Sequence, residues 1–213
     1  QRDRADLVAA DLGFAIAPRL NAAGRLDDMS IGIRCLLADR EVEARALAAR
    51  LDQLNAERRA IEARMQTEAL AAVRHLGPVV TSGPRQRTGV CLYDAAWHQG
   101  VVGLVASRLK ERLRRPVVAF ANGGEGQLRG SARSIAGVHI RDVLENIAAR
   151  RPELIVRFGG HAMAAGLTLE PARLDAFAAE FDAEVRRWLG AGADTGRLDT
   201  DGELGTDDLC LAT

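Results

Sequence analysis

Residues 90–121 have the sequence VCLYDAAWHQGVVGLVASRLKERLRRPVVAFA, and this stretch decides the fold. It begins with a short apolar run, residues 90–93, and ends with another, residues 116–121, so we expect a buried strand at each end. Between them, residues 99–114 carry apolar side chains at helical spacing: Val101, Val102, Leu104, Val105 and Leu109. The stretch therefore predicts a β-loop-α-β unit and an α/β fold.

The residues that follow extend this unit into a compact domain. We expect a strand at residues 128–134, after a glycine-rich turn, and a helix at residues 140–150. A glycine-rich strand at residues 156–169 and a helix at residues 171–189, which a proline begins, complete the pattern. Residues 88–190 together predict one α/β domain with a mixed sheet.

A long helix precedes this domain. From Asp39, a good N-cap residue, to His75 there is no glycine or proline. Apolar residues recur there every three, four or seven positions: Leu47, Leu51, Leu54, Ile61, Met65, Ala69 and Val73. Such a helix would be about 50 Å long, which exceeds the diameter of a small domain. We therefore expect residues 39–76 to link two bodies.

The two ends of the chain differ in composition from the middle. Residues 1–38 are too short to fold alone, and we expect helices there, interrupted by Gly13, Pro18 and Gly24 around an arginine- and glycine-rich turn. Glycines and prolines between residues 77 and 88 predict a linker. The Gly/Asp-rich residues 191–213 indicate the start of a further domain or a disordered tail.

Charge is balanced over the whole chain, with 29 basic and 29 acidic side chains, but it is uneven along it. Residues 1–87 carry 14 basic and 12 acidic side chains, residues 88–190 carry 14 and 11, and residues 191–213 carry 1 and 6. An acidic C-terminal segment therefore masks a basic body, and a nucleic-acid partner is not excluded. Lys110 is the single lysine, so an anion site would be built from arginine.

The composition is that of a soluble globular chain, with 47% apolar and 27% charged residues. No apolar run approaches the roughly 20 residues that cross a bilayer, and residues 1–4 do not begin a signal peptide. Three widely spaced cysteines, Cys35, Cys91 and Cys210, indicate free thiols rather than disulfides or a zinc site. We therefore expect a cytoplasmic protein without a membrane partner.

Two polar clusters lie at the ends of predicted helices. Arg19, Asn21 and Arg25 would offer several donors to phosphate oxygens, although a solvated helix end has the same composition. His98 lies just before the helix at residues 99–114, where an anion is favoured. A structural Trp-His pair is the alternative interpretation there.

Two further clusters lie on predicted strands. Ser131 and Arg133 are two residues apart, so they share one face of a strand and could clamp a phosphate; a half-exposed edge strand is the alternative. Gly159 and Gly160 would let a ligand approach the backbone beside His161; a core histidine at a tight turn is the alternative.

Motifs that would activate water are missing from the sequence. It has no Asp-His-His, His-x-x-Glu-His or Cys-x-x-Cys motif for a metal, no P-loop and no nucleophile elbow. We therefore expect no metal site within this chain. The residues able to bind phosphate are present without those that would cleave it.

Four sequence runs occur together and in this order in the single-stranded-DNA exonucleases of the DHH/DHHA1 phosphoesterase family. They are PRLNAAGRL (18–26), WHQGVVGLVASRL (97–109), RGSARS (129–134) and FGGHAMAAG (158–166). Over about residues 5–190 the chain resembles the C-terminal part of these enzymes. The resemblance implies that residues 1–38 end a DHH domain, 39–76 form the interdomain helix and 88–190 form a DHHA1 domain. It further implies that residues 191–213 begin an OB-fold.

The resemblance also implies a function and a cofactor. It implies a 5′→3′ exonuclease that uses two Mn²⁺ or Mg²⁺ ions to hydrolyse phosphodiester bonds of single-stranded DNA in recombination and repair. The Asp-His-His motif of the family has no counterpart here, so the metal ligands are expected upstream and this chain alone is expected to be inactive. Single-stranded DNA, a helicase and a single-strand-binding protein are the implied partners of a monomer.

Site residues carry over from the family onto matching positions. His161 would be the catalytic histidine facing the metals, with Gly159 and Gly160 closing the cleft. The implied DNA- and phosphate-binding residues are Arg19, Asn21, Arg25, His98, Ser131 and Arg133. Two alternatives stay open: a non-catalytic nucleic-acid-binding module, and a DHH/DHHA1 enzyme that degrades oligoribonucleotides or cyclic dinucleotides.

Overall fold

The computed structural model describes residues 8–75, 87–190 and residue 202. Its centre is a five-stranded sheet formed by β1 (Val90–Tyr93), β2 (Val117–Asn122), β3 (Leu128–Arg133), β4 (Arg157–His161) and β5 (Ala164–Leu169). The strand order is β1-β2-β3-β5-β4, with β1 parallel to β2 and all other neighbours antiparallel. The predicted α/β fold with a mixed sheet is therefore confirmed.

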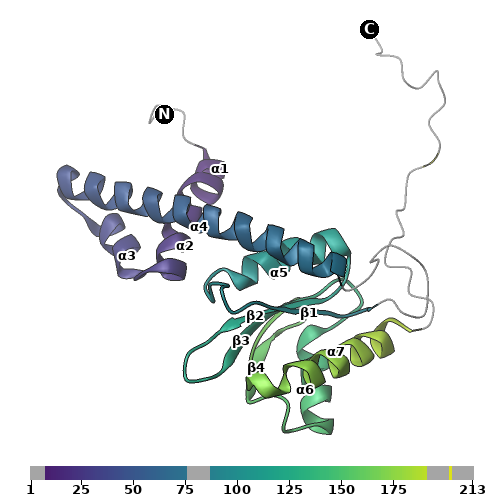
Figure 1. The fold of residues 1–213 in the computed structure, drawn as a ribbon. Helices are drawn as coiled ribbons and strands as arrows, with labels where there is room; N and C mark the ends of the chain where they lie inside the picture. The colour runs from purple at the N-terminus through teal and green to yellow at the C-terminus, as the bar shows by residue number, and fades with distance from the viewer. Residues whose placement is uncertain (1–7, 76–86, 191–201, 203–213) are drawn as a thin grey trace.

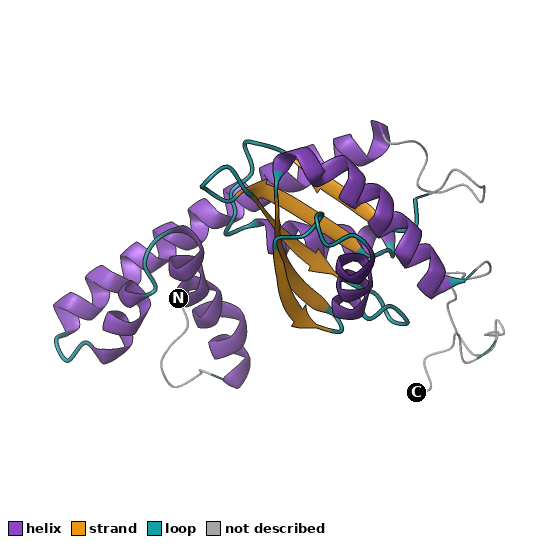
Figure 2. Cartoon of the chain, turned by 90° about the horizontal axis from the view of Figure 1, so that it is seen from below, coloured by secondary structure: helices purple, strands orange, loops and turns teal. Residues whose placement is uncertain are grey.

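Helices cover both faces of this sheet (Figures 1 and 2). On one face lies α5 (Val102–Leu113), and on the other lie α6 (Ile140–Arg150) and α7 (Leu174–Leu189), which follows a 3-10 turn at Pro171–Arg173. Strand β2 is buried on both faces: Val118 and Phe120 join the core beneath α6 and α7, while Ala119 joins the core beneath α5. This double burial explains why residues 116–121 are uniformly apolar.

The long helix α4 (Glu41–His75) packs against both parts of the chain (Figure 1). Near its N-terminal end, Leu51 and Leu54 pack on two fully buried alanines of α2 (Ala17–Leu26), and α3 (Ser30–Leu37) lies beside them. Further along, Met65 and Ala69 join the core under α5. The helix thus ties the N-terminal helices to the sheet, as the periodicity predicts.

Three local predictions about the N-terminal half are wrong. Ala9–Asp11 (α1), a π-helical turn at Leu12–Ile16 and α2 form one uninterrupted helical run, so Gly13, Pro18 and Gly24 do not break it. Pro18 is the second residue of α2 and closely follows the wider π turn that ends at Ile16. The predicted turn at residues 19–25 is accordingly helical.

The third error concerns the start of α4. The helix begins at Glu41, and the carbonyl of Arg40 accepts the N–H of Ala44, so Arg40 and not Asp39 occupies the N-cap position. The side chain of Arg40 pairs with Glu43 at 3.1 Å. The helix therefore starts one residue later than the N-cap preference of Asp39 predicts.

The glycine-rich strand predicted at residues 156–169 is in fact two strands. β4 and β5 form a hairpin whose turn is Ala162 and Met163, residues that carry no turn signal. The turn is held from outside, because Ser134 and Ile140 donate their backbone N–H groups to the carbonyls of Met163 and Ala162 at 3.0 and 2.9 Å. Tertiary contacts, and not local sequence, place this turn.

Most of the predicted linker and tail lie outside the described residues, which leave out 76–86, 191–201 and 203–213. None of the helices in the described ranges combines the length and the apolar character needed to cross a membrane. What matters for the site is that α5 packs over β1, β2 and β3, so that β5 and β4 are left uncovered on this face and a hollow remains over β3 beside α2.

Candidate nucleic-acid interface

Three rows of side chains cross the open half of the sheet. Residues that stand opposite each other in antiparallel strands share a face, and Ser131 stands opposite Ala119, which packs under α5. The rows therefore lie on the α5 side. From β3 through β5 to β4 they are Arg133, Ala164 and His161; Ser131, Gly166 and Gly159; and Arg129, Thr168 and Arg157. The outer rows carry the cationic and imidazole groups, and the middle row has almost no side chains.

Two adjoining hollows occupy this surface. The first, of about 370 Å³, lies between Arg25 on α2, Gln99 and Gly100 before α5, and Ser131 and Arg133 on β3. The second, of about 340 Å³, lies over the β3, β5 and β4 strands. Arg129 and Gly130 line both hollows, so together they form one groove, which we call the arginine groove.

Ser131 and Arg133 form the centre of the first hollow. The guanidinium Nη1 of Arg133 donates to Ser131 Oγ and to the carbonyl of Ala132, both at 2.8 Å, which fixes the direction of the side chain. Gly103 of α5 lies against them, since a Cβ there would lie 2.9 Å from Arg133 Nη2. The predicted clamp is thus formed, and a glycine on α5 makes the room for it.

Arg25 faces the same hollow from α2. Its Nη1 donates to the carbonyl of Gly100 at 3.2 Å, which brings α2 against the loop before α5. Burial of the Arg133 guanidinium, and then the positive charge of Arg25, lower the pKa of Arg133 below its ordinary value. Two cations that repel each other in a partly buried place favour an anion between them.

No carboxylate neutralises the arginine groove within the described residues. Arg25, Arg129, Arg133 and Arg157 make no ion pair there, and neither hollow is lined by an acidic residue. Arginines elsewhere pair routinely: Arg50 with Asp27 at 2.8 Å and Arg58 with Glu62 at 2.5 Å are examples. The groove therefore keeps its positive charge available for a ligand.

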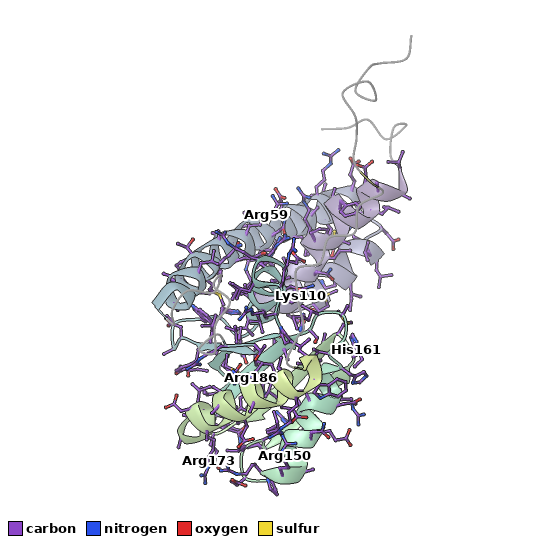
Figure 3. All side chains as sticks on the ribbon, turned by 90° about the vertical axis from the view of Figure 1, so that its right-hand side faces the viewer. Arg59, Lys110, Arg150, His161, Arg173 and Arg186 are labelled. Carbon is purple, nitrogen blue, oxygen red and sulfur yellow. The ribbon has the colours of Figure 1, made fainter. Side chains whose placement is uncertain are left out.

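His161 stands at the β4 end of the row that begins with Arg133. It is exposed, and its Nδ1 accepts the backbone N–H of Met163 at 3.3 Å (Figure 3). This hydrogen bond leaves Nε2 free to face a ligand and orients the ring. The interpretation of His161 as a buried core histidine is therefore wrong for this structure.

The two glycines beside His161 have different reasons to be glycine. A Cβ at Gly160 would lie 2.4 Å from the carbonyl oxygen of Ala164, and its φ is +152°, so the fold itself requires glycine there. A Cβ at Gly159 would meet nothing within 4 Å. Packing therefore does not require glycine at position 159, whereas an open groove floor for a ligand does.

Five of the predicted site residues lie outside the lining of the arginine groove: Gly160 and His161, which follow the lining residue Gly159 on β4, and Arg19, Asn21 and His98. Arg19 Nε pairs with Asp52 at 2.8 Å and its Nη1 donates to the Ala15 carbonyl, so its guanidinium holds α2 to α4. Asn21 is exposed on α2. His98 Nδ1 accepts the N–H of Gly100 at 3.1 Å, which shapes the loop beside the groove.

Sequence reasoning missed Arg129, Arg157 and Gln99, which line the groove. The signal for Arg129 was present, because it continues the alternation of Ser131 and Arg133 along one strand face. The same alternation does not predict Arg157, because the sequence indicates a single strand over residues 156–169. Its position opposite Thr168 follows only from the hairpin.

The described residues contain no group of three or more His, Cys, Asp or Glu side chains that could hold a metal ion. His161 has no carboxylate partner among them. The groove can therefore bind and orient an anion, but its own residues do not fit a metal centre.

Comparison with known protein families gives a match over most of the sheet region. Residues 86–187 match the DHHA1 domain. The chain is also similar to the single-stranded-DNA-specific exonuclease RecJ of several bacteria. It is 53% identical over 212 residues to that of Dickeya dadantii, 49% over 210 residues to that of Escherichia coli and 34% over 180 residues to that of Thermus thermophilus.

These alignments cover 100%, 99% and 84% of this chain but 36%, 36% and 24% of the three relatives. The chain thus spans about a third of the length of the first two. Among solved structures, it resembles RecJ from Thermus thermophilus in complex with Mg²⁺, with a TM-score of 0.68 and 36% identity over 84% of this chain and 26% of that one. It resembles exonuclease RecJ bound to manganese with a TM-score of 0.69 and 35% identity, over 84% of this chain and 42% of that one.

Proposed function

The chain belongs to the RecJ family of DHHA1-domain proteins, and on this premise we propose that its arginine groove binds the 5′ end of single-stranded DNA in a 5′→3′ exonuclease. One observation carries the proposal: Arg25 and Arg133 meet over Ser131 in a groove without carboxylates. A terminal phosphate would accept hydrogen bonds from both guanidiniums and from the serine hydroxyl.

The groove has the lining of a phosphate-binding surface. Arginines that are hydrogen-bonded to the backbone supply donors at its first hollow, and its floor is glycine, so contacts to the phosphates of a strand predominate. Sequence-independent binding that weakens with salt follows from this inventory. The relatives are named as exonucleases specific for single-stranded DNA, which supports the same substrate class here.

We assign His161 the role of the group that meets the scissile phosphate. It is exposed, oriented through Nδ1 and aligned in one row with Arg133, which supports a position at the reacting end of the bound strand. Two solved relatives contain Mg²⁺ or manganese, and such ions would supply the activated water. The described residues do not fit a metal centre, so we expect the ligands of such ions to come from outside this chain.

The remaining parts of the proposal concern the whole protein. Residues 1–38 would end a DHH domain, 39–76 would be the interdomain helix, 88–190 the DHHA1 domain and 191–213 the start of an OB-fold. Arg19, Asn21 and His98 would contact DNA outside the groove. A role in recombination and repair would place a monomeric enzyme in the cytoplasm beside a helicase and a single-strand-binding protein.

The experiment is a comparison of binding with hydrolysis. The purified 213-residue chain is expected to bind 5′-phosphorylated single-stranded DNA and to hydrolyse none of it with Mn²⁺ present. In the complete protein, His161→Ala should lower turnover at least about a hundredfold while changing affinity little, because a positioned acid–base group contributes roughly 10²–10⁴-fold. Robust digestion by the chain alone, or equal losses of turnover and affinity in His161→Ala, would contradict the proposal.

A non-catalytic nucleic-acid-binding module is the second candidate. The lack of a metal-binding group among the described residues favours it for this chain in isolation. The same experiment separates the two, because a binding module would leave the complete protein without metal-dependent hydrolysis as well.

A further inference from the structure

The second hollow of the arginine groove has a cationic lining of its own. It contains Arg129 on β3 and Arg157 on β4, with the buried Thr168 of β5 between them in the same row. Its lining includes no acidic residue, and neither arginine makes an ion pair within the described ranges. The first hollow does not use these two guanidiniums together, since Arg157 lines only the second.

Both arginines are held in place by the fold. Arg157 Nε donates to Thr168 Oγ1 at 3.3 Å, which keeps its guanidinium over β5. The aliphatic part of Arg129 lies against Gly123, because a Cβ at Gly123 would lie 2.4 Å from Arg129 Cγ. Gly123 thus makes room for the Arg129 side chain. Because these contacts already fix both side chains, each loses less conformational entropy when it binds a ligand.

The floor beside the row of Arg129, Thr168 and Arg157 has no side chains. Gly159 of β4 stands opposite Gly166 of β5, and packing requires glycine at neither position. A Cβ at Gly159 would meet nothing within 4 Å, and the nearest atom to a Cβ at Gly166 would be the Gly130 carbonyl oxygen at 4.0 Å. An elongated ligand can therefore lie directly on the backbone there.

Spacing decides what this second hollow can bind. Arg129 and Arg133 are four residues apart on one strand, which is about 13 Å. This separation is larger than a single phosphate group, and Arg157, which lines only the second hollow, lies on β4, two strands away from β3. The two hollows are nevertheless continuous through Arg129 and Gly130. One ligand with several phosphates fits this arrangement.

We propose that Arg129, Arg157 and Thr168 form a second phosphate subsite, which binds an internal phosphate of the same nucleic-acid strand whose 5′ phosphate lies at Ser131 and Arg133. This proposal rests on the proposed function, because it assigns the first hollow to the 5′ end. It makes binding depend on strand length: a strand must extend beyond the first subsite before the second contributes.

The test compares two lengths of DNA in the 213-residue chain. The probes are 5′-phosphorylated oligothymidylates of two and twelve nucleotides with a 3′ fluorophore, measured by anisotropy over a salt series. Arg157→Ala, which removes a guanidinium that lines only the second hollow, should bind the dinucleotide as the unchanged chain does and bind the twelve-nucleotide strand about tenfold less tightly. The double variant Arg129→Ala/Arg157→Ala should weaken binding of the longer strand at least as much. Its salt slope should fall by about 0.7 for each phosphate that the variant no longer neutralises.

Two further variants separate the subsite from general charge or misfolding. Arg129→Lys/Arg157→Lys keeps both charges and should restore most of the salt slope. Arg173→Ala removes a cation that makes no ion pair within the described residues and lies in the 3-10 turn before α7, away from His161 in Figure 3, and it should change neither probe. Thermal unfolding of the alanine double variant should match that of the unchanged chain.

The outcomes distinguish this inference from the function on which it rests. Equal loss for both probes in Arg157→Ala, or an unchanged salt slope with the longer strand, would overturn the second subsite while leaving the first intact. Failure of the unchanged chain to bind either probe would overturn both. Release of bound DNA from the alanine double variant and from Arg173→Ala to the same extent would show a diffuse charge effect and no subsite.

Discussion

Gly100 and Arg25 touch through their backbones: a Cβ on Gly100 would lie 2.1 Å from the carbonyl oxygen of Arg25. The contact joins α2 to the loop before α5, and Arg25 Nη1 donates back to the Gly100 carbonyl at 3.2 Å. Because one of these partners is a main-chain oxygen, it cannot rotate away from an added atom. This contact holds one wall of the arginine groove against the other.

Gly100→Ala should therefore separate the two walls. We expect a loss of about 1–3 kcal/mol in the free energy of unfolding, as for other overpacked sites, together with weaker DNA binding. Denaturant unfolding and anisotropy measure the two effects. Gly13→Ala is the matched control, because a Cβ there meets nothing within 4 Å and should not lower stability. Wild-type stability and affinity in Gly100→Ala would show that the contact is dispensable.

The neighbouring glycines of β4 should respond in opposite ways. Gly160→Ala should unfold the hairpin locally, since its Cβ would meet the Ala164 carbonyl and Ala165 at 2.4 and 2.5 Å. Gly159→Ala should leave the melting temperature unchanged and reduce DNA affinity, because only the groove floor changes. The pair is checked by thermal unfolding and anisotropy. A destabilised Gly159→Ala would mean that the fold, and not a ligand, selects this glycine.

Arg133→Ala should weaken binding without weakening the fold. The guanidinium is partly desolvated and repelled by Arg25, and both effects lower the pKa of Arg133. Its removal relieves these costs, so we expect the free energy of unfolding to stay equal or rise. Affinity should fall for every DNA sequence alike, and the salt slope should decrease by about 0.7. An Arg133→Ala chain that is less stable and binds DNA normally would contradict this assignment.

Acid should weaken the contact between α6 and α7. Burial alone would raise the pKa of Glu184, but hydrogen bonds from Asn146, Arg150 and Arg187 outweigh it and hold that pKa below its ordinary value. Glu184 therefore stabilises the fold above its unfolded pKa of about 4.3, and this contribution is lost as pH falls through the lower folded value.

Glu184→Gln should consequently flatten the dependence of stability on pH below about 4.3 and cost about 1–3 kcal/mol near neutrality, measured by denaturant unfolding across pH. Glu145→Gln is the control, because its pair with Arg141 at 3.5 Å is exposed and should contribute little. If the free energy of unfolding of Glu184→Gln fell as steeply with decreasing pH as that of the unchanged chain, another carboxylate would be responsible for the acid sensitivity.

Much of the fold followed from periodicity in the sequence. The unit at residues 90–121 was predicted to within a few residues. Strand β2 is buried on both faces and α5 on one, so the positions of their apolar residues directly reflect which side chains are buried. The long helix α4 was predicted for the same reason. The β4–β5 hairpin was not, since its turn is held by Ser134 and Ile140 from outside.

The candidate site was predicted in part. Ser131, Arg133, Arg25 and Gly159 do line one groove, and the spacing of Ser131 and Arg133 on one strand face was readable from sequence. Arg19 has the same local sequence signal as Arg25, but its guanidinium is paired with Asp52, which lies 33 residues away in sequence. A partner so distant in sequence leaves no local trace, so the choice between these two arginines required the structure.

The central claim is that the arginine groove binds a 5′ phosphate. The direct measurement is the affinity of the 213-residue chain for two short single strands of identical sequence, one ending in a 5′ phosphate and the other in a 5′ hydroxyl. We predict at least about tenfold tighter binding of the phosphorylated strand, since a charge-assisted hydrogen-bond pair contributes roughly 1.5–3 kcal/mol, and loss of this preference in Arg25→Ala/Arg133→Ala. Equal affinity for both strands in the unchanged chain would contradict the claim.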